Sequence, residues 1–127
     1  MSIKIKVNEL NKDKPFFVKT TNANMRLVLN FQLLLAKSDD LSEQAKEDAD
    51  SVKSSDMLKE QLKIIDSTTE LIQNILHLNE KQLKRLDDME TEDSILLANR
   101  ITMRMNGFTE KEIQKMYEED VDDEGKE

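Results

Sequence analysis

The chain has no cysteine and no tryptophan, a single proline, a single histidine and only two glycines among its 127 residues. Without cysteine it can form neither disulfides nor thiolate metal sites, and a lone histidine leaves a zinc site incomplete. Since the glycines are Gly107 and Gly125, no glycine-rich loop is available to cradle a phosphate. These absences argue against an enzyme.

The side chains that remain for catalysis are carboxylates and His77. We interpret His77 as a half-buried structural residue near the end of an apolar helix. Asp39–Asp40 and Asp87–Asp88 lie in solvated segments, whereas a general acid needs a desolvated carboxyl group. The acidic C-terminus also lacks the ligand spacing of a calcium loop. We therefore expect no catalytic residue, no metal and no cofactor.

Long apolar runs are missing as well. None approaches the roughly 20 residues that cross a bilayer, and residues 1 to 6 alternate apolar with basic side chains, unlike a signal peptide. Acidic residues outnumber basic ones, 27 to 19, which gives a net charge of −8. This charge opposes binding to nucleic acid and to anionic lipid. We expect an intracellular protein whose partners are proteins.

Residues 2 to 20 have the pattern of a β-hairpin. Ile3, Ile5 and Val7 alternate with polar residues, as in a half-buried strand. Turn-forming residues follow as far as Pro15, which suits the start or edge of a second strand. An isolated hairpin is marginal in water, so its apolar face must pack on helices or pair with another chain.

Two apolar segments predict long helices. Residues 24 to 37 carry apolar side chains on nearly every face, which indicates a helix central to a core or shared with a partner. Residues 57 to 78 form one apolar stripe, made by Leu58, Leu62, Ile65, Ile72, Ile75 and Leu76. Between them, the polar composition of residues 38 to 56 favours a mobile acidic linker over an extension of a neighbouring helix.

Capping signals mark shorter helices in the second half of the chain. Asn79 begins a capping-box pattern, and Thr91 can cap the next helix. Gly107 suits the left-handed position after a helix. Thr109 and Glu112 have the spacing of a second capping box, and Ile113, Met116 and Tyr117 follow on one face.

Residues 95 to 117 resemble a helix–turn–helix. The would-be recognition helix is rich in glutamate, however, so we favour an αα-hairpin packed on the core. Beyond it the chain is too charged to fold alone. The sequence predicts a mainly α fold with a short N-terminal β-hairpin (small α+β), a helical core of four to five helices in one domain over residues 1 to 117, and a disordered acidic tail over 118 to 127.

The methionines permit two interpretations. They can fill the core, or they can form a flexible surface for varied apolar partners. Met103 and Met105 are two residues apart and cannot share one helix face well, so we expect one of them to be exposed.

The order of these features resembles small tail assembly chaperones of long-tailed phages that infect Gram-positive bacteria. Residues 76 to 86 (LHLNEKQLKRL), residues 94 to 113 (SILLANRITMRMNGFTEKEI) and the acidic C-terminus carry the resemblance. It implies a non-enzymatic protein that binds the tape-measure protein and recruits tail-tube subunits. Such a protein acts in the host cytoplasm and leaves before the virion is finished. Homo-oligomerisation stays open.

If the resemblance holds, we expect exposed apolar helix faces to hold the client while carboxylates keep the complex in solution. The client-facing candidates come from the first long helix and the methionine pair: Leu27, Phe31, Leu34, Leu35, Met103 and Met105. The main alternative is an acidic regulator, such as a DNA mimic or an inhibitor of a basic nucleic-acid-binding protein. A DNA-binding repressor is a third hypothesis.

Overall fold

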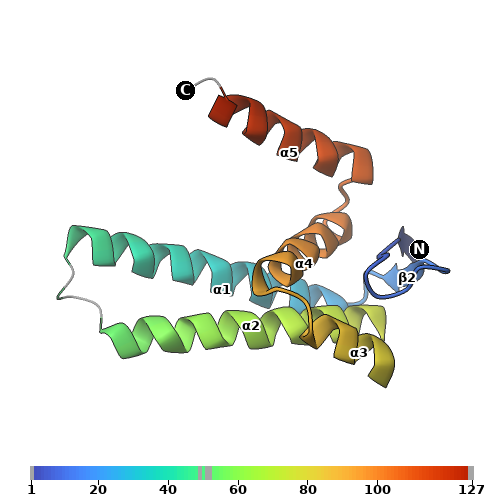
Figure 1. Ribbon diagram of the computed structural model, residues 1–127, viewed down its shortest axis with the longest axis horizontal. Coiled ribbons are helices and arrows are strands. Elements are labelled where there is room, and N and C mark those ends of the chain that lie inside the picture. Colours follow the sequence, from blue (N-terminus) through green and yellow to red (C-terminus); the bar gives the residue numbers. More distant parts are fainter. Residues whose placement is uncertain (1, 49, 51–52, 126–127) are drawn as a thin grey trace.

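The computed structural model describes residues 2 to 48, 50 and 53 to 125, with side chains as far as residue 119. This part of the chain holds two strands, β1 (Ser2–Ile5) and β2 (Phe16–Lys19), followed by five helices (Figure 1). The helices are α1 (Asn22–Glu47), α2 (Ser54–Leu76), α3 (Glu80–Asp87), α4 (Thr91–Met105) and α5 (Glu110–Gly125). The predicted fold class, mainly α with an N-terminal β-hairpin, is confirmed.

The hairpin has the register that its alternating pattern requires. β1 and β2 are antiparallel, with Ile3 opposite Val18 and Ile5 opposite Phe16. Ile5 and Val18 are buried, because successive side chains of a strand point to opposite faces and this face lies on the helices. The sequence leaves open whether the hairpin packs on helices or pairs with another chain, and in the structure it packs on helices of its own chain.

Two arginine side chains of helix α4 donate hydrogen bonds to the main chain of the hairpin. The guanidinium of Arg104 donates a hydrogen bond to the carbonyl oxygen of Lys4 at 2.8 Å, and Arg100 donates one to the carbonyl oxygen of Lys6. Unpaired main-chain groups at a strand edge otherwise invite pairing with another chain. Arg104 therefore satisfies a carbonyl of β1, and Arg100 satisfies one in the segment that follows this strand.

Helices α1 and α2 form a long antiparallel pair (Figure 1). α1 continues without a break to Glu47, and α2 begins at Ser54. The linker expected over residues 38 to 56 is therefore wrong for 38 to 47 and 54 to 56. Despite the polar composition, α1 has a narrow line of half-buried small and apolar residues in this segment: Ser38, Leu41 and Ala45.

One hydrophobic core joins the hairpin to the first part of α1, the second half of α2 and α4. Its members are Ile5, Val7, Leu10, Val18, Val28, Phe31, Leu71, Ile72, Ile75, Leu76, Leu86, Leu97, Ala98, Ile101 and Met105. This part of the molecule is termed the base. The paired ends of α1 and α2, residues 34 to 47 and 54 to 66, project from it and are termed the arm (Figure 1). All arm residues are described, and none of them is fully buried.

The short connections follow local signals in the sequence. His77 ends α2 in the left-handed conformation, with φ 54, and its side chain is exposed rather than half-buried as we had expected. Asn79 and Gln82 form the predicted capping box, in which the Gln82 amide donates to Asn79 Oδ1 at 2.8 Å. The N-cap of α4 is Glu90, so the predicted cap at Thr91 is shifted by one residue.

The turn into α5 also has the predicted chemistry. Gly107 has φ 102, and the Glu112 amide donates to Thr109 Oγ1 at 3.2 Å while Glu112 accepts from the Thr109 amide. Helix α5 includes residues 118 to 125, so the predicted disordered acidic tail is wrong for these residues. Glutamate has good helix propensity, so a capped first turn can propagate through it. Residues 126 and 127 lie outside the described part of the chain.

Candidate partner-binding surfaces

The six client-facing candidates do not form one surface. Leu27, Leu34, Leu35 and Met103 are half-buried. Phe31 and Met105, in contrast, are 0% and 3% exposed and belong to the core. The prediction needs correction at these two residues, because a side chain that fills the core is not available to a client. Contact of the other four with a client stays a prediction.

The most exposed apolar stripe of α2 lies on the arm. Leu58 is 60% exposed, Leu62 62% and Ile65 42%. They are four and three residues apart, so they lie along one face of the helix. We term these three residues the arm stripe. The sequence predicts one stripe from these residues to Ile72, but it gives no sign that the stripe is uncovered on the arm, because that depends on where α4 and the hairpin end.

Two further exposed apolar groups lie elsewhere. Leu29 and Leu33 are one helical turn apart on α1 and are 58% and 63% exposed. Phe17 of β2 is 66% exposed. Residues of this kind are ordinary when they occur singly, whereas contiguous groups mark interaction sites. The arm stripe is the longest of these groups on a single helix among the described residues.

A groove of about 440 Å³ lies between α1, α4 and α5. Leu35 and Met103, two of the candidates from the sequence, line it together with Met116 and Tyr117 of α5. Gln32, Ala36, Asp39, Asn99 and Thr102 complete the lining. We term it the α1–α5 groove. No pattern in the sequence predicts that α1 and α5 lie together, because local patterns do not specify which distant helix faces meet.

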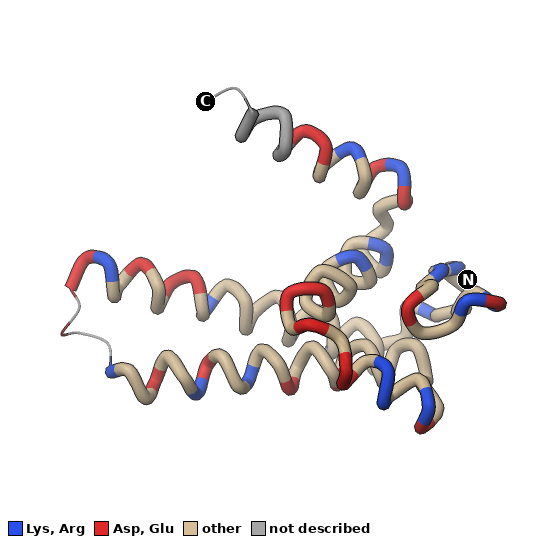
Figure 2. The backbone as a smooth tube through the Cα atoms, in the orientation of Figure 1, with Lys and Arg blue, Asp and Glu red and all other residues tan. Residues whose placement is uncertain are grey.

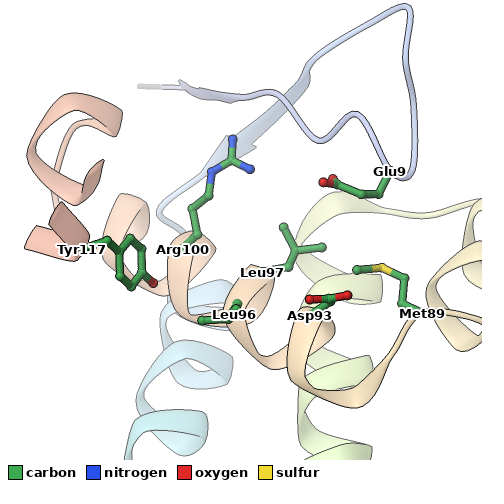
Figure 3. A pocket seen from close by; sticks show the side chains of 7 residues that line it. All are labelled: Glu9, Met89, Asp93, Leu96, Leu97, Arg100 and Tyr117. Atoms are coloured by element: carbon green, nitrogen blue, oxygen red, sulfur yellow. The ribbon is translucent and has the colours of Figure 1, made fainter. Parts of the chain in front are cut away.

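A second hollow of about 550 Å³ lies between the hairpin loop, α4 and α5. It is lined by Glu9, Met89, Asp93, Leu96, Leu97, Arg100 and Tyr117 (Figure 3). In Figure 3, Tyr117 stands at one end and Glu9 and Met89 at the other. We term it the hairpin-side hollow. Tyr117 lines both this hollow and the α1–α5 groove.

One carboxylate fixes the orientation of α5. Glu110 Oε2 accepts from Arg100 Nε at 3.0 Å, and Glu110 Oε1 lies 3.7 Å from Arg104 Nε. The same arginines hold the carbonyls of residues 4 and 6, so hairpin, α4 and α5 meet at this point. Ile113, 2% exposed, packs α5 against the rest of the fold.

Acidic residues are spread along the backbone of the arm and α5, with lysines and arginines between them (Figure 2). The three carboxylates that line the groove and the hollow, Asp39, Glu9 and Asp93, have no ion-pair partner among the described residues. Within the same residues there is no group of three or more His, Asp and Glu placed to hold a metal ion. No described helix is long and apolar enough to cross a membrane.

Apolar faces, apolar hollows and unpaired carboxylates on a small helical scaffold are typical of a protein that works by binding other polypeptides. A family model described as phage tail assembly chaperone proteins, TAC, matches residues 3 to 121, nearly the whole chain. The chain therefore belongs to the phage tail assembly chaperone family. Neither a curated protein nor a solved structure matches it significantly.

Proposed function

We propose that this chaperone binds the phage tape-measure protein and tail-tube subunits during tail morphogenesis, through apolar surfaces led by the arm stripe. In this proposal it acts in the host cytoplasm by binding alone, without catalysis, and is absent from the finished virion. The observation that carries the proposal is the exposure of Leu58, Leu62 and Ile65 along one face of α2.

The energetic argument is burial of apolar surface. Covering an exposed Leu or Ile side chain fully contributes about 1.5 to 3 kcal/mol, and the arm stripe offers three such side chains that are about half exposed. That suffices for reversible capture of an apolar helix, and the two-helix arm can present it without disturbing the base. The net charge of −8 keeps a partly covered complex from aggregating.

The proposal is tested by co-expression with a tape-measure fragment of the phage that encodes this chain. The variant Leu58→Gln/Leu62→Gln/Ile65→Gln keeps helix propensity and removes the stripe. We expect it to capture at least about tenfold less fragment than the wild type. The matched control is Lys59→Gln/Asp66→Asn/Glu70→Gln, three exposed polar positions of the same helix.

Equal capture by the stripe variant and its control would contradict the role of the arm, and no capture by the wild type would contradict the function itself. Salt separates the proposal from the alternative of an acidic regulator. Binding through the arm stripe should persist between about 50 and 200 mM salt, whereas binding by charge alone should collapse over that range.

A further inference from the structure

The α1–α5 groove and the hairpin-side hollow share a composition. Each has apolar side chains in its lining: Leu35, Met103 and Met116 in the groove, Leu96 and Leu97 in the hollow. Each also presents at least one carboxylate that has no ion-pair partner in the described chain, as noted above. Tyr117 borders both. Arg100, which also lines the hollow, has its charge paired with Glu110. The groove and the hollow, which meet at Tyr117, are together termed the recess under α5; its lining combines apolar side chains with carboxylates that have no ion-pair partner in the described chain.

Two further carboxylates stand close to the α1–α5 groove without lining it. Glu43 follows Asp39 by one helical turn on α1, and Glu119 follows Met116 by three residues on α5, so both stand next to the groove on their helices. Both are exposed and have no ion-pair partner among the residues that the structure describes. An occupant of the recess therefore gains from apolar side chains together with positive charge.

The geometry favours a helical occupant over an extended one. All lining residues of the α1–α5 groove stand on the helices α1, α4 and α5, and most of those of the hairpin-side hollow stand on α4 and α5. An added strand needs main-chain groups to pair with, and those of a helix interior are already used within the helix. A helical occupant satisfies its own main-chain hydrogen bonds and needs side-chain contacts alone.

From these features we infer that the recess under α5 binds an amphipathic helix of a partner protein, with aliphatic residues on one face and lysine or arginine along its edges. The inference rests on the proposed function in that a tail protein supplies the helix. It concerns a surface separate from the arm stripe, and it states which chemical class of segment is recognised there.

The single tyrosine makes the recess directly observable. Tyr117 is the only tyrosine and the chain has no tryptophan, so its emission reports on the recess in the full-length protein. The probes are three helical peptides without tyrosine or tryptophan. One has a leucine face with lysine edges, the second has the same face with glutamate edges, and the third has the composition of the first in scrambled order. Titrations are run at about 150 mM salt to screen long-range attraction.

We expect the first peptide alone to change the Tyr117 emission saturably. Methyl resonances of Met103 and Met116, which line the groove, should shift on binding, whereas that of Met57 on the arm should not. Equal binding of the glutamate or scrambled peptide, or shifts at Met57 without shifts at Met103, would overturn the inference. So would groove shifts that appear on raising the protein concentration without peptide, because a second copy would then be the occupant.

Charge variants give the matched control. Asp39→Lys removes the carboxylate that lines the groove, and Asp40→Lys makes the same change one residue further on, outside the lining. We expect Asp39→Lys to weaken binding of the lysine-edged peptide by about fivefold or more and Asp40→Lys to leave it nearly unchanged. Equal effects would show general attraction to an acidic protein. Capture of the tape-measure fragment that persists while all peptides fail would sink this inference and leave the proposed function standing.

Discussion

The two halves of α2 carry the same apolar stripe, which is buried in one half and exposed in the other. In the base, Ile72 and Ile75 are 0% exposed, and they share one core with residues of the hairpin, α1 and α4. On the arm, Leu62 and Ile65 continue the stripe and remain open. The same three- and four-residue spacing of apolar side chains therefore forms a core where other elements cover it and an exposed surface where they do not. Burial, rather than residue type, separates the stabilising half from the half that we propose to bind clients.

The largest expected effect comes from two identical substitutions on this helix. Ile72→Ala should lower the free energy of unfolding by about 2 to 5 kcal/mol, because it leaves a cavity in the core. Ile65→Ala, seven residues earlier on the same face, should lower it by less than about 1 kcal/mol. Urea denaturation of the two variants measures both. Similar losses would mean that the arm is packed as tightly as the base.

Gly107 tests the junction between α4 and α5. Its φ of 102 lies where a side chain is strained, although a Cβ atom there would meet nothing within 4 Å. We expect Gly107→Ala to cost about 1 kcal/mol in unfolding free energy, all of it from the backbone. Asn106→Ala, next to it in an ordinary conformation, serves as control. A loss of several kcal/mol would mean that the added methyl group clashes with a neighbour.

Two buried threonines of the base differ in hydrogen bonding. Thr68 Oγ1 donates to the Ile64 carbonyl at 2.7 Å, whereas Thr102 Oγ1 has no hydrogen-bond partner among the described residues. Thr68→Val should therefore destabilise the protein by about 1 kcal/mol, and Thr102→Val should be neutral or stabilising by a similar amount. Thermal unfolding of the two variants shows whether each substitution lowers or raises the stability. The same sign for both would contradict the difference in pairing.

The smallest effect concerns the ion pairs of Glu110. Because that carboxylate is 45% exposed, its removal in Glu110→Gln should change the unfolding free energy by no more than about 1 kcal/mol. It should nevertheless loosen α5, which lowers the fluorescence anisotropy of Tyr117. Glu119→Gln, further along α5, should leave the anisotropy as it is. Equal anisotropy in both variants would mean that Ile113 alone fixes the helix.

Much of the fold follows from local patterns in the sequence. The alternation around Ile5 predicts the hairpin, the Asn79 capping box opens α3, and Gly107 stands at the left-handed turn. These features depend on residues within a few positions of one another. The helical extension from 38 to 47 was missed because its support comes from α2, and composition alone does not record a narrow seam between two helices.

The candidate surfaces were harder to predict for the same reason. A helix that is apolar on nearly every face gives no sign of which face is covered, so Phe31 was assigned to a client and lies in the core. The stripe of α2 was recognised, but its exposure at Leu58 and Leu62 depends on where α4 and the hairpin end. Leu35 and Met103 line the α1–α5 groove only because the tertiary fold brings α1, α4 and α5 together.

The central claim is that the arm stripe, and not the buried continuation of the same stripe around Ile72, receives the tape-measure client. Hydrogen–deuterium exchange of the full chain, alone and in complex with a tape-measure fragment, tests it most directly. We expect slower exchange of the amides in residues 54 to 66 when the fragment is bound, and unchanged exchange around Ile72 and Ile75. A bound fragment that leaves residues 54 to 66 unprotected would contradict the claim.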